Sequence, residues 1–190
     1  VYKSFEKASS LLGKNFQIII VDSLEELKKV DKVVLPGVGA FSDCMQGMNN
    51  IKGLVNLLHD MILKDAKPFL GICVGMQLLA NFSKEYGYTE GLSWIEGDVS
   101  SIEIVEAEMK VPHMGWNSVH FNEKHSLFNR IKQDEDFYFV HSYKFNVKNN
   151  KLVKSNIKTD LKKKQINKKE INNKYKQYIS DIKNINKNIN

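Results

Sequence analysis

The sequence predicts an α/β fold in which a parallel sheet, mixed at its edge, carries helices on both faces. Short β-branched runs alternate with helical patterns through the first 147 residues, which is typical of a parallel sheet. These runs are apolar at nearly every position, as expected for strands that are covered on both sides. In such sheets, ligands bind beyond the carboxyl ends of the strands.

The first elements alternate between helix and strand. Residues 4–13 have apolar spacing suited to a helix that ends at its glycine. Residues 16–22, with the sequence FQIIIVD, read as a short buried strand. The helix expected over 23–30 begins at Ser23, and Glu26 follows three residues later, which is the pattern of a capping box.

The remaining elements lead to the motifs that carry chemistry. Residues 31–37 (DKVVLPG) form the next expected strand, and a long helical stretch runs from about 42 to 64. A third buried strand over 67–73 leads directly into a helix over 75–83. Shorter extended pieces follow at 101–105, 117–121 and 137–145.

The composition changes sharply near residue 147. Residues 148–190 hold 13 lysines against three acidic residues, so the net charge of +6 leaves about −4 on residues 1–147. A Lys/Asn/Ile-rich segment of this kind buries too little apolar surface to order itself, and an A/T-rich or frame-shifted gene end would encode the same composition. We therefore expect one domain over 1–147 and a low-complexity, disordered tail over 148–190.

The basic tail does not read as a nucleic-acid-binding arm, because the whole chain has a single arginine, Arg130, against 27 lysines. No apolar run is long enough to cross a bilayer, and the sequence shows no secretory signal. The two cysteines, Cys44 and Cys73, read as free thiols of a reducing compartment. We expect a cytoplasmic protein with neither nucleic acid nor membrane as a partner.

Cys73 lies where a strand must bend sharply into a helix, with Gly71 and Gly75 two residues to either side. A nucleophile elbow needs this arrangement, because small residues let the backbone make the strained turn. The thiol then stands at a helix N-terminus, which favours thiolate, and the N–H of Val74 becomes an oxyanion donor. The alternative is a small buried hydrophobe, which is how Cys44 reads.

Four motifs, in the same order along the chain, resemble the class I glutamine amidotransferases. They are VVLPGVGAF (33–41), PFLGICVGMQLLA (68–80), VPHMGWNSV (111–119) and FYFVHSY (137–143). The third motif is similar to that of the glutaminase subunit of imidazole glycerol phosphate synthase, which acts in histidine biosynthesis. The resemblance covers roughly residues 1–147 and implies the class I amidotransferase fold.

The resemblance implies that Cys73 attacks the side-chain amide of glutamine, so that ammonia and then glutamate are released. Ammonia would pass to a cyclase partner in a heterodimer, and no metal or cofactor is implied. The matching positions divide into three groups by role. The oxyanion group holds Val38, Gly39 and Val74; the glutamine-binding group holds Gln77, Ser142 and Tyr143; the cyclase-facing group holds Met114, Trp116 and Asn117.

The histidines of the sequence provide neither a metal site nor the expected catalytic base. His113, His120 and His125 are close in sequence but lack the spacing of metal ligands, so no zinc site is expected. The resemblance places the catalytic base on a histidine well beyond His141, two residues before a glutamate, and no histidine follows His141. The family's first strand also has no counterpart, so the resemblance implies a fold that is incomplete at both ends.

Three functions therefore remain open. The first is a glutaminase subunit in histidine biosynthesis that is impaired because the triad histidine and glutamate are absent. The second is a paralogous amidotransferase that supplies ammonia for amidation of another metabolite, such as a surface sugar. The third is a non-catalytic relative that only binds a partner.

Overall fold

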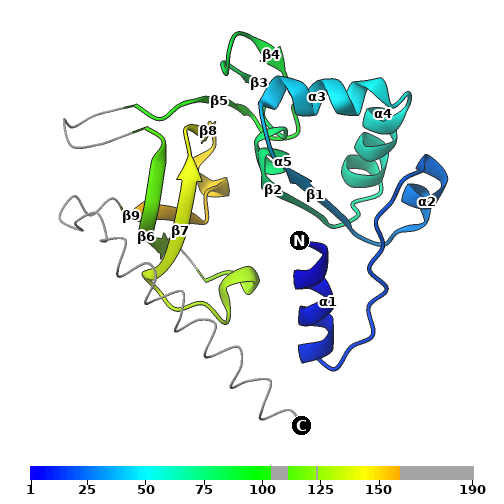
Figure 1. The fold of residues 1–190 in the computed structure, drawn as a ribbon, viewed down its shortest axis with the longest axis horizontal. Coiled ribbons are helices and arrows are strands. Elements are labelled where there is room, and N and C mark those ends of the chain that lie inside the picture. The colour runs from blue at the N-terminus through cyan, green and yellow to red at the C-terminus, as the bar shows by residue number, and fades with distance from the viewer. Residues whose placement is uncertain (104–110, 123, 159–190) are drawn as a thin grey trace. The chain divides into compact units, whose positions relative to one another are not determined.

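The computed structural model describes residues 1–103, 111–122 and 124–158, and these form a mixed α/β fold, as the sequence predicts (Figure 1). The chain divides into two compact units. Unit 1 comprises Val1–Ser101 with Tyr143–Asn149, and unit 2 comprises Ile102–Ser142 with Asn150–Asn190. No helix in the described part of the chain is long and apolar enough to cross a membrane.

Unit 1 contains the helices of the fold. They are α1 (Tyr2–Leu11), α2 (Leu24–Lys29), α3 (Phe41–Asn50), α4 (Leu54–His59), which continues as the π-helical turn η1 (Asp60–Lys64), and the one-turn α5 (Val74–Gln77). The N-cap of α2 is as expected, since the Ser23 hydroxyl accepts a hydrogen bond from the Glu26 N–H at 3.3 Å. The return bond of a capping box is shifted by one residue, because the Glu26 carboxylate accepts from the Asp22 N–H at 3.5 Å. The single helix expected over 42–64 is wrong. It breaks before α4 because Gly53 has φ +88°, a left-handed conformation that ends a helix.

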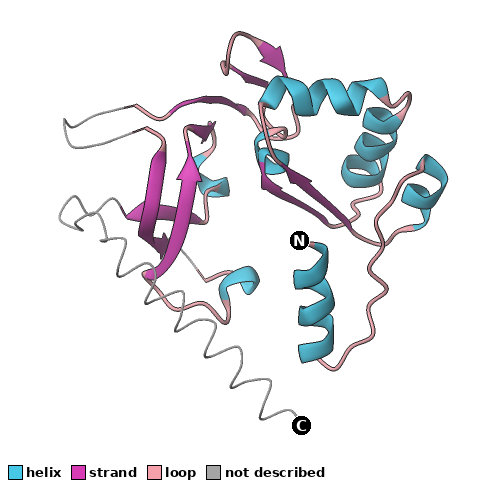
Figure 2. Cartoon of the chain, viewed as in Figure 1, coloured by secondary structure: helices cyan, strands magenta, loops and turns pink. Residues whose placement is uncertain are grey.

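Unit 1 holds two sheets in its described part (Figure 2). β1 (Val33–Gly37) and β2 (Phe69–Cys73) pair in parallel, residue for residue, from Val33 with Phe69 to Gly37 with Cys73. The second sheet has the order β4 (Thr89–Glu90), β3 (Phe82–Ser83), β5 (Gly97–Ser101) and β8 (Tyr143–Val147). The two carboxyl ends of β1 and β2 thus lie together, as expected for a site at that edge.

The core of unit 1 anchors the start of α3. Phe41, the first residue of α3, is completely buried, together with Leu78 and Val99. Burying one such side chain stabilises a fold by about 1.5–3 kcal/mol. Because Phe41 follows β1 by only four residues, the loop between them is held firmly at both ends.

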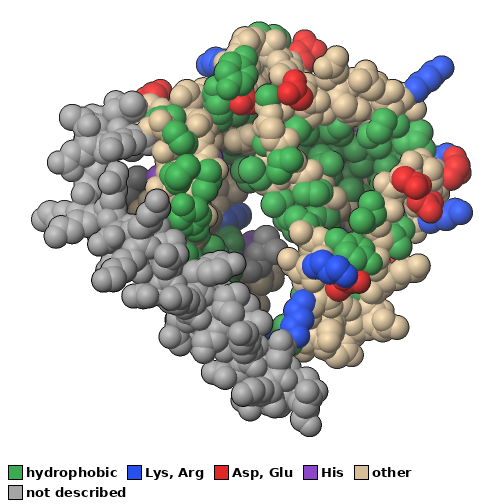
Figure 3. Space-filling model, in the orientation of Figure 1, with side chains coloured by type: hydrophobic (Ala, Val, Ile, Leu, Met, Phe, Trp, Pro, Cys, Tyr) green, Lys and Arg blue, Asp and Glu red, His purple; other side chains and the backbone are tan. Residues whose placement is uncertain are grey.

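The buried strand expected over 16–22 is wrong. The segment has no strand partner among the described residues, and Phe16, Ile19 and Ile20 are exposed. An extended run becomes a strand only when a neighbour accepts its backbone hydrogen bonds, and β1 pairs with β2 alone. Figure 3 shows hydrophobic side chains gathered at the surface of unit 1, over β1 and α4.

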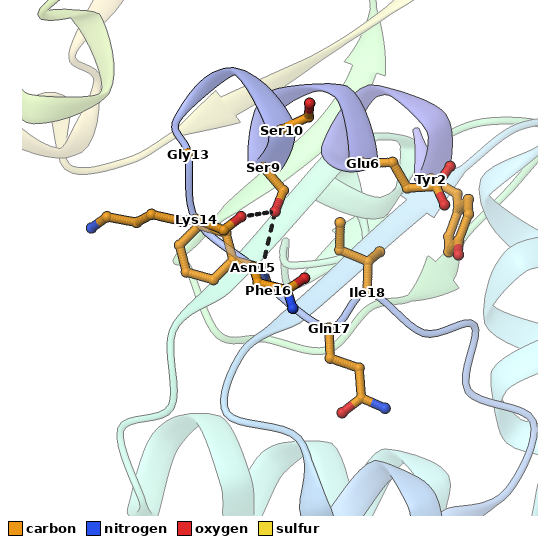
Figure 4. A pocket seen from close by; sticks show the side chains of 10 residues that line it. All are labelled: Tyr2, Glu6, Ser9, Ser10, Gly13, Lys14, Asn15, Phe16, Gln17 and Ile18. Carbon is orange, nitrogen blue, oxygen red and sulfur yellow. Dashed lines mark hydrogen bonds between the residues drawn. The ribbon is translucent and has the colours of Figure 1, made fainter.

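A shallow pocket of about 580 Å³ lies between α1 and the unpaired run after it (Figure 4). The Ser9 hydroxyl closes this turn: it donates to the Lys14 carbonyl at 2.5 Å and accepts from the Phe16 N–H at 3.1 Å. Ten residues line the pocket: Tyr2, Glu6, Ser9, Ser10, Gly13, Lys14, Asn15, Phe16, Gln17 and Ile18. None of them was expected in the catalytic site.

Unit 2 is built on a three-stranded antiparallel sheet. β6 (His113–Phe121) lies between β7 (Glu135–His141) and β9 (Ser155–Lys158), with short 3₁₀ turns η2 (Ser126–Phe128) and η3 (Asn150–Leu152) outside it. β9 falls in the range that composition assigned to the tail. The sheet therefore extends beyond the expected boundary at 147, because β6 offers a free edge for Ser155–Lys158 to pair with. The rest of the expected tail, 159–190, lies outside the described residues.

Three smaller expectations also change. The helix expected over 75–83 ends at Gln77, and the chain then turns into β3. The extended pieces expected at 101–105 and 117–121 become the end of β5 and the second half of β6, although residues 104 and 105 lie outside the described residues. The piece expected over 137–145 is two strands, because the chain leaves β7 at His141 and enters another sheet at Tyr143.

Candidate active site

Cys73 occupies a strained turn between β2 and α5. Its φ of 56° and ψ of −121° fall outside the regions that non-glycine residues ordinarily adopt. Such a conformation costs about 1–3 kcal/mol and persists only where the surrounding structure holds it. The thiol is exposed at the end of the strand. The observed backbone therefore has the shape that a nucleophile elbow requires.

Three glycines allow β1, β2 and α5 to approach closely enough to hold this turn. A Cβ added to Gly71 would lie 2.7 Å from the Gly75 carbonyl oxygen. A Cβ on Gly75 would overlap the carbonyl oxygen of Leu35, and one on Gly37 would lie 2.6 Å from the Gly75 nitrogen. Because all of these obstacles are backbone atoms, no side-chain adjustment relieves them. The glycine frame is thus a packing requirement of the elbow.

The loop after β1 lies beside the elbow, since Gly37 pairs in register with Cys73. Val38 follows with its side chain 88% exposed, and Gly39 has φ +96°, which a side chain would strain. The Val38 carbonyl accepts a hydrogen bond from the Cys44 thiol at 3.5 Å. The backbone N–H groups of Gly39 and Val74 are the expected oxyanion donors, and the structure brings both residues to the same end of the parallel pair.

Cys44 differs from Cys73 in its surroundings. Its side chain is partly buried on α3, and burial, together with the Asp43 and Glu85 carboxylates, raises the pKa of its thiol. A thiol with a raised pKa stays protonated at neutral pH and is a poor nucleophile. The surroundings of Cys44 are therefore those of a packing residue and not those of a nucleophile.

Gln77 and Tyr143, both expected to bind glutamine, are in contact within unit 1. The Gln77 amide Nε2 donates a hydrogen bond to the Tyr143 carbonyl oxygen at 3.4 Å. Gln77 ends α5, one turn after Cys73, and Tyr143 begins β8. Partial burial, with the nearby Glu85 carboxylate and Tyr86, raises the pKa of the Tyr143 phenol.

Glu85 is a residue of this region that the sequence reasoning missed. Its side chain is only 9% exposed, and its Oε2 accepts a hydrogen bond from the Phe41 N–H at 2.8 Å. The carboxylate thus satisfies a free N–H in the first turn of α3, where Ala40 supplies no side-chain cap. No sequence spacing links Glu85 to α3, so a buried carboxylate at this point was visible only in the structure.

Unit 2 carries the other expected site residues. The three residues expected to face the cyclase lie on two different faces of its sheet. Met114 and Trp116 lie on one face of β6, opposite Val140 and Tyr138 of β7. Asn117 lies on the other face, where its amide contacts the His113 ring. The alternation of a strand would have revealed this division, since residues an odd number apart face opposite ways. Ser142 follows β7, and its carbonyl accepts a hydrogen bond from the Ile102 N–H at 2.9 Å.

The face of β6 and β7 that carries Met114 is apolar and exposed in the part nearest the start of β6. Met114 is 59% exposed, Val140 57% and Tyr138 45%, and the Tyr138 ring meets the Trp116 ring edge-on with centroids 5.6 Å apart. Figure 3 shows hydrophobic side chains along β7. A contiguous exposed apolar face of this kind marks an interaction surface. We call Met114, Trp116, Tyr138 and Val140 the apolar face of β6–β7.

Within the described part of the chain, no three His, Cys, Asp or Glu side chains are grouped so that they could hold a metal ion. The stretch beyond His141 in which the resemblance would place a triad histidine and glutamate falls largely in 159–190, outside the described residues. Its sequence contains no histidine.

The fold and the elbow define a class of protein, and sequence comparison agrees. A family model described as "Glutamine amidotransferase class-I" matches residues 3–180. The chain belongs to the class I glutamine amidotransferase family, a family of enzymes. Its match runs into the range that composition assigned to the tail.

More particular similarities lie within that family. The chain is 42% identical over 150 residues to "Imidazole glycerol phosphate synthase subunit HisH" of Brucella suis biovar 1 (strain 1330), covering 77% of this chain and 69% of that protein. It is 46% identical over 144 residues to the protein of the same name from Rhodospirillum rubrum, covering 75% and 67%. The one from Agrobacterium fabrum is 42% identical over 144 residues, covering 74% and 67%.

Proposed function

We propose that the chain is the glutaminase subunit of an imidazole glycerol phosphate synthase, which hydrolyses glutamine to glutamate and ammonia. The observation that carries this proposal is the strained backbone of Cys73 between Gly71 and Gly75. Cys73 combines φ 56° with ψ −121°, which lies outside even the left-handed helical region, and an exposed nucleophile at a strand end gives such strain a function. The similarity to proteins named HisH supports the choice of synthase.

In the proposed reaction, the Cys73 thiolate attacks the side-chain amide carbon of glutamine and forms a tetrahedral oxyanion. The N–H groups of Val74 and Gly39 donate to that oxyanion, and Val38 orients the peptide that carries the second donor. One such donor contributes about 2.7–4 kcal/mol in a comparable hydrolase. As the intermediate collapses, the amide nitrogen takes a proton from solvent, the C–N bond breaks, and ammonia departs to leave a γ-glutamyl thioester. Water then hydrolyses the thioester to glutamate and regenerates the Cys73 thiol.

The amino-acid end of glutamine would lie against Gln77, Ser142 and Tyr143. We add Glu85 to this group. Its buried carboxylate acts electrostatically on both Tyr143 and Cys44, so it lies close to the expected substrate region. A buried negative charge attracts the α-ammonium group of an amino acid, because the low dielectric strengthens the interaction.

The partner would be the cyclase subunit, bound as a heterodimer through the apolar face of β6–β7. Met114 and Trp116 belong to the expected interface, and Tyr138 and Val140 extend it on the same face. Asn117 faces the other way and would support the interface from behind. Ammonia released at Cys73 would pass to the cyclase without meeting solvent.

A non-catalytic relative that only binds a partner, without turnover of glutamine, is the second candidate. One observation favours it: no histidine follows His141, so the sequence offers no residue at the position of the triad base. The two candidates share the elbow and the interface and differ only in the rate at which the thioester turns over.

The test separates binding from chemistry. The chain is co-expressed with a cyclase subunit, and complex formation is measured by native mass spectrometry. Tyr138→Ala is expected to weaken the complex about tenfold, whereas Phe137→Ala, on the opposite face of β7, leaves it unchanged.

Glutamine is then added and the γ-glutamyl thioester on Cys73 is sought by intact mass. A wild-type chain that neither binds the cyclase nor is acylated by glutamine would refute the proposal.

A further inference from the structure

Three polar side chains form a connected group on the face of β6–β7 that lies opposite the apolar face. His113 begins β6 and pairs in register with His141, the last residue of β7. The His113 Nδ1 lies 2.8 Å from the His141 Nε2, and the His113 Nε2 lies 2.5 Å from the Asn117 amide nitrogen. The His113 ring also stacks on Phe139, with centroids 5.3 Å apart and planes 26° apart.

The chemistry of these groups fixes the direction of the hydrogen bonds. The Asn117 Nδ2 can only donate, so the His113 Nε2 accepts from it. The single proton of a neutral His113 ring then lies on Nδ1, which donates to the His141 Nε2. Asn117, His113 and His141 thus form a directed chain of donors, and its last member is the residue that precedes Ser142.

The surroundings of His113 favour its neutral form. Burial, with a smaller contribution from His141, lowers the pKa of His113. On the same face, the charged residue of β7 is Glu135, which pairs with Val119 six residues along β6, about 20 Å from His113. Asp136 and His120 lie on the opposite face. On β9, Ser155 and Ile157 are the residues opposite Phe121 and Val119, and neither is charged.

We propose that His113 is a positioning residue for glutamine binding, which acts by holding His141 and thereby the backbone of Ser142. This inference rests on the proposed function, in which Ser142 and Tyr143 bind the amino-acid end of glutamine. Three contacts within unit 2 hold Ser142 in place: the β6–β7 backbone pairing that ends at His141, the His113–His141 side-chain hydrogen bond, and the bond from the Ile102 N–H to the Ser142 carbonyl. Removing the side-chain bond leaves the backbone pairing in place but loosens the end of β7, and this weakens the binding of glutamine.

The same geometry makes the positioning sensitive to pH. A second proton on His113 would place an N–H on Nε2 against the amide hydrogens of Asn117, so the chain breaks at that point. Affinity for glutamine is therefore expected to fall in acid, over a range below the ordinary pKa of histidine, because burial lowers the pKa of His113.

The experiment uses the full chain and the diazoketone analogue of glutamine, which alkylates the nucleophile. Saturation of the labelling rate yields an affinity and a maximal rate constant. His113→Phe keeps a flat ring to stack on Phe139 but donates no hydrogen bond. It is expected to lower the affinity about fivefold, the equivalent of one ordinary hydrogen bond, while the maximal rate stays within twofold. His120→Phe, on the other face of β6, is the matched control and is expected to match wild type.

Two further measurements separate positioning from general damage. Affinity in wild type and in His120→Phe should fall between pH 7.5 and 5.5, whereas His113→Phe should show a flat profile. The imidazole nitrogen resonance of the His141 Nε2 should shift in His113→Phe and not in His120→Phe. An affinity and pH profile of His113→Phe that match the control would overturn the inference. A wild-type chain that shows no saturation would instead refute the proposed function, and this positioning role would fall with it.

Discussion

Gly37 and Cys73 are register partners at the ends of the parallel strands β1 and β2. This pairing places the loop that follows β1 beside the turn that presents the thiol, although 36 residues separate the two in the chain. A loop whose N–H groups stabilise an oxyanion must lie next to the nucleophile, and a parallel register achieves this with two short strands.

Cys73, and not Cys44, is expected to be the thiol that electrophiles modify. Cys73 is exposed at a strained strand end, whereas burial raises the pKa of the partly buried Cys44 thiol and keeps it protonated. The measurement is iodoacetamide labelling at pH 7.5, mapped by peptide mass. Cys44→Ala should leave the labelling rate unchanged and Cys73→Ala should abolish it. Faster modification of Cys44 than of Cys73 would contradict the assignment.

Gly75→Ala is expected to destabilise the fold, because the added Cβ would overlap the backbone carbonyl of Leu35. Overpacking of this kind costs about 1–3 kcal/mol in free energy of unfolding. Gly47→Ala is the matched control. Gly47 lies inside α3 with nothing within 4 Å of its added Cβ, so this change should stabilise the fold by about 0.5–1 kcal/mol. Urea unfolding followed by circular dichroism measures both, and equal effects of the same sign would rule out the packing account.

Stability is expected to decrease as the pH falls below about 6.5. The folded state lowers the pKa of His113, so between its folded pKa and 6.5 the unfolded chain binds more protons than the folded one. The free energy of unfolding therefore rises with pH across that window. The contribution of His113 to stability is lost as the pH drops through it. Urea unfolding at pH 5.5 and 7.5 measures this, and His113→Phe should reduce the difference between them. An unchanged difference in His113→Phe would assign the pH dependence to other groups.

Local patterns in the sequence predicted those features that local forces decide. The Ser23 N-cap and the glycine frame of Cys73 each depend on residues close together in the chain, and both are present. The strand predicted over 16–22 is absent because a β-branched apolar run indicates a tendency to be buried but does not show whether a neighbouring strand is present. Gly53 could have been read as a break in the expected helix 42–64, yet a lone glycine is tolerated in many helices.

In the candidate site, too, local features could be predicted from the sequence and long-range contacts could not. The order of motifs made Cys73 and the loop at Val38 candidates, because the elbow is a local feature with a fixed spacing. Glu85 escaped notice because its role depends on a hydrogen bond to Phe41, 44 residues away. The link from His113 to His141 likewise depends on the register of β6 and β7, which no single segment of the sequence specifies.

Glutamine turnover by this chain is expected to be far below an ordinary enzymatic rate, even with a cyclase partner bound. The exposed Cys73 thiol can attack the amide and form a thioester, but the leaving amine needs a proton and the attacking water needs a base. The resemblance assigns both tasks to a histidine beyond His141, and the sequence has none there. In a comparable hydrolase, loss of the base lowers turnover about 10⁶-fold.

Since typical enzymes turn over at roughly 1–10³ s⁻¹, that loss leaves a rate near or below about 10⁻³ s⁻¹. The assay is glutamate release from glutamine, with and without the cyclase and its nucleotide ligand, and Cys73→Ala is the blank. Glutamate release close to that of the Cys73→Ala blank is the expected outcome, because both the departure of the amine and the hydrolysis of the thioester lack their proton carrier. Cys73-dependent turnover near one per second would show that the base comes from a residue other than a histidine beyond His141. The pH profile of that activity would then identify it.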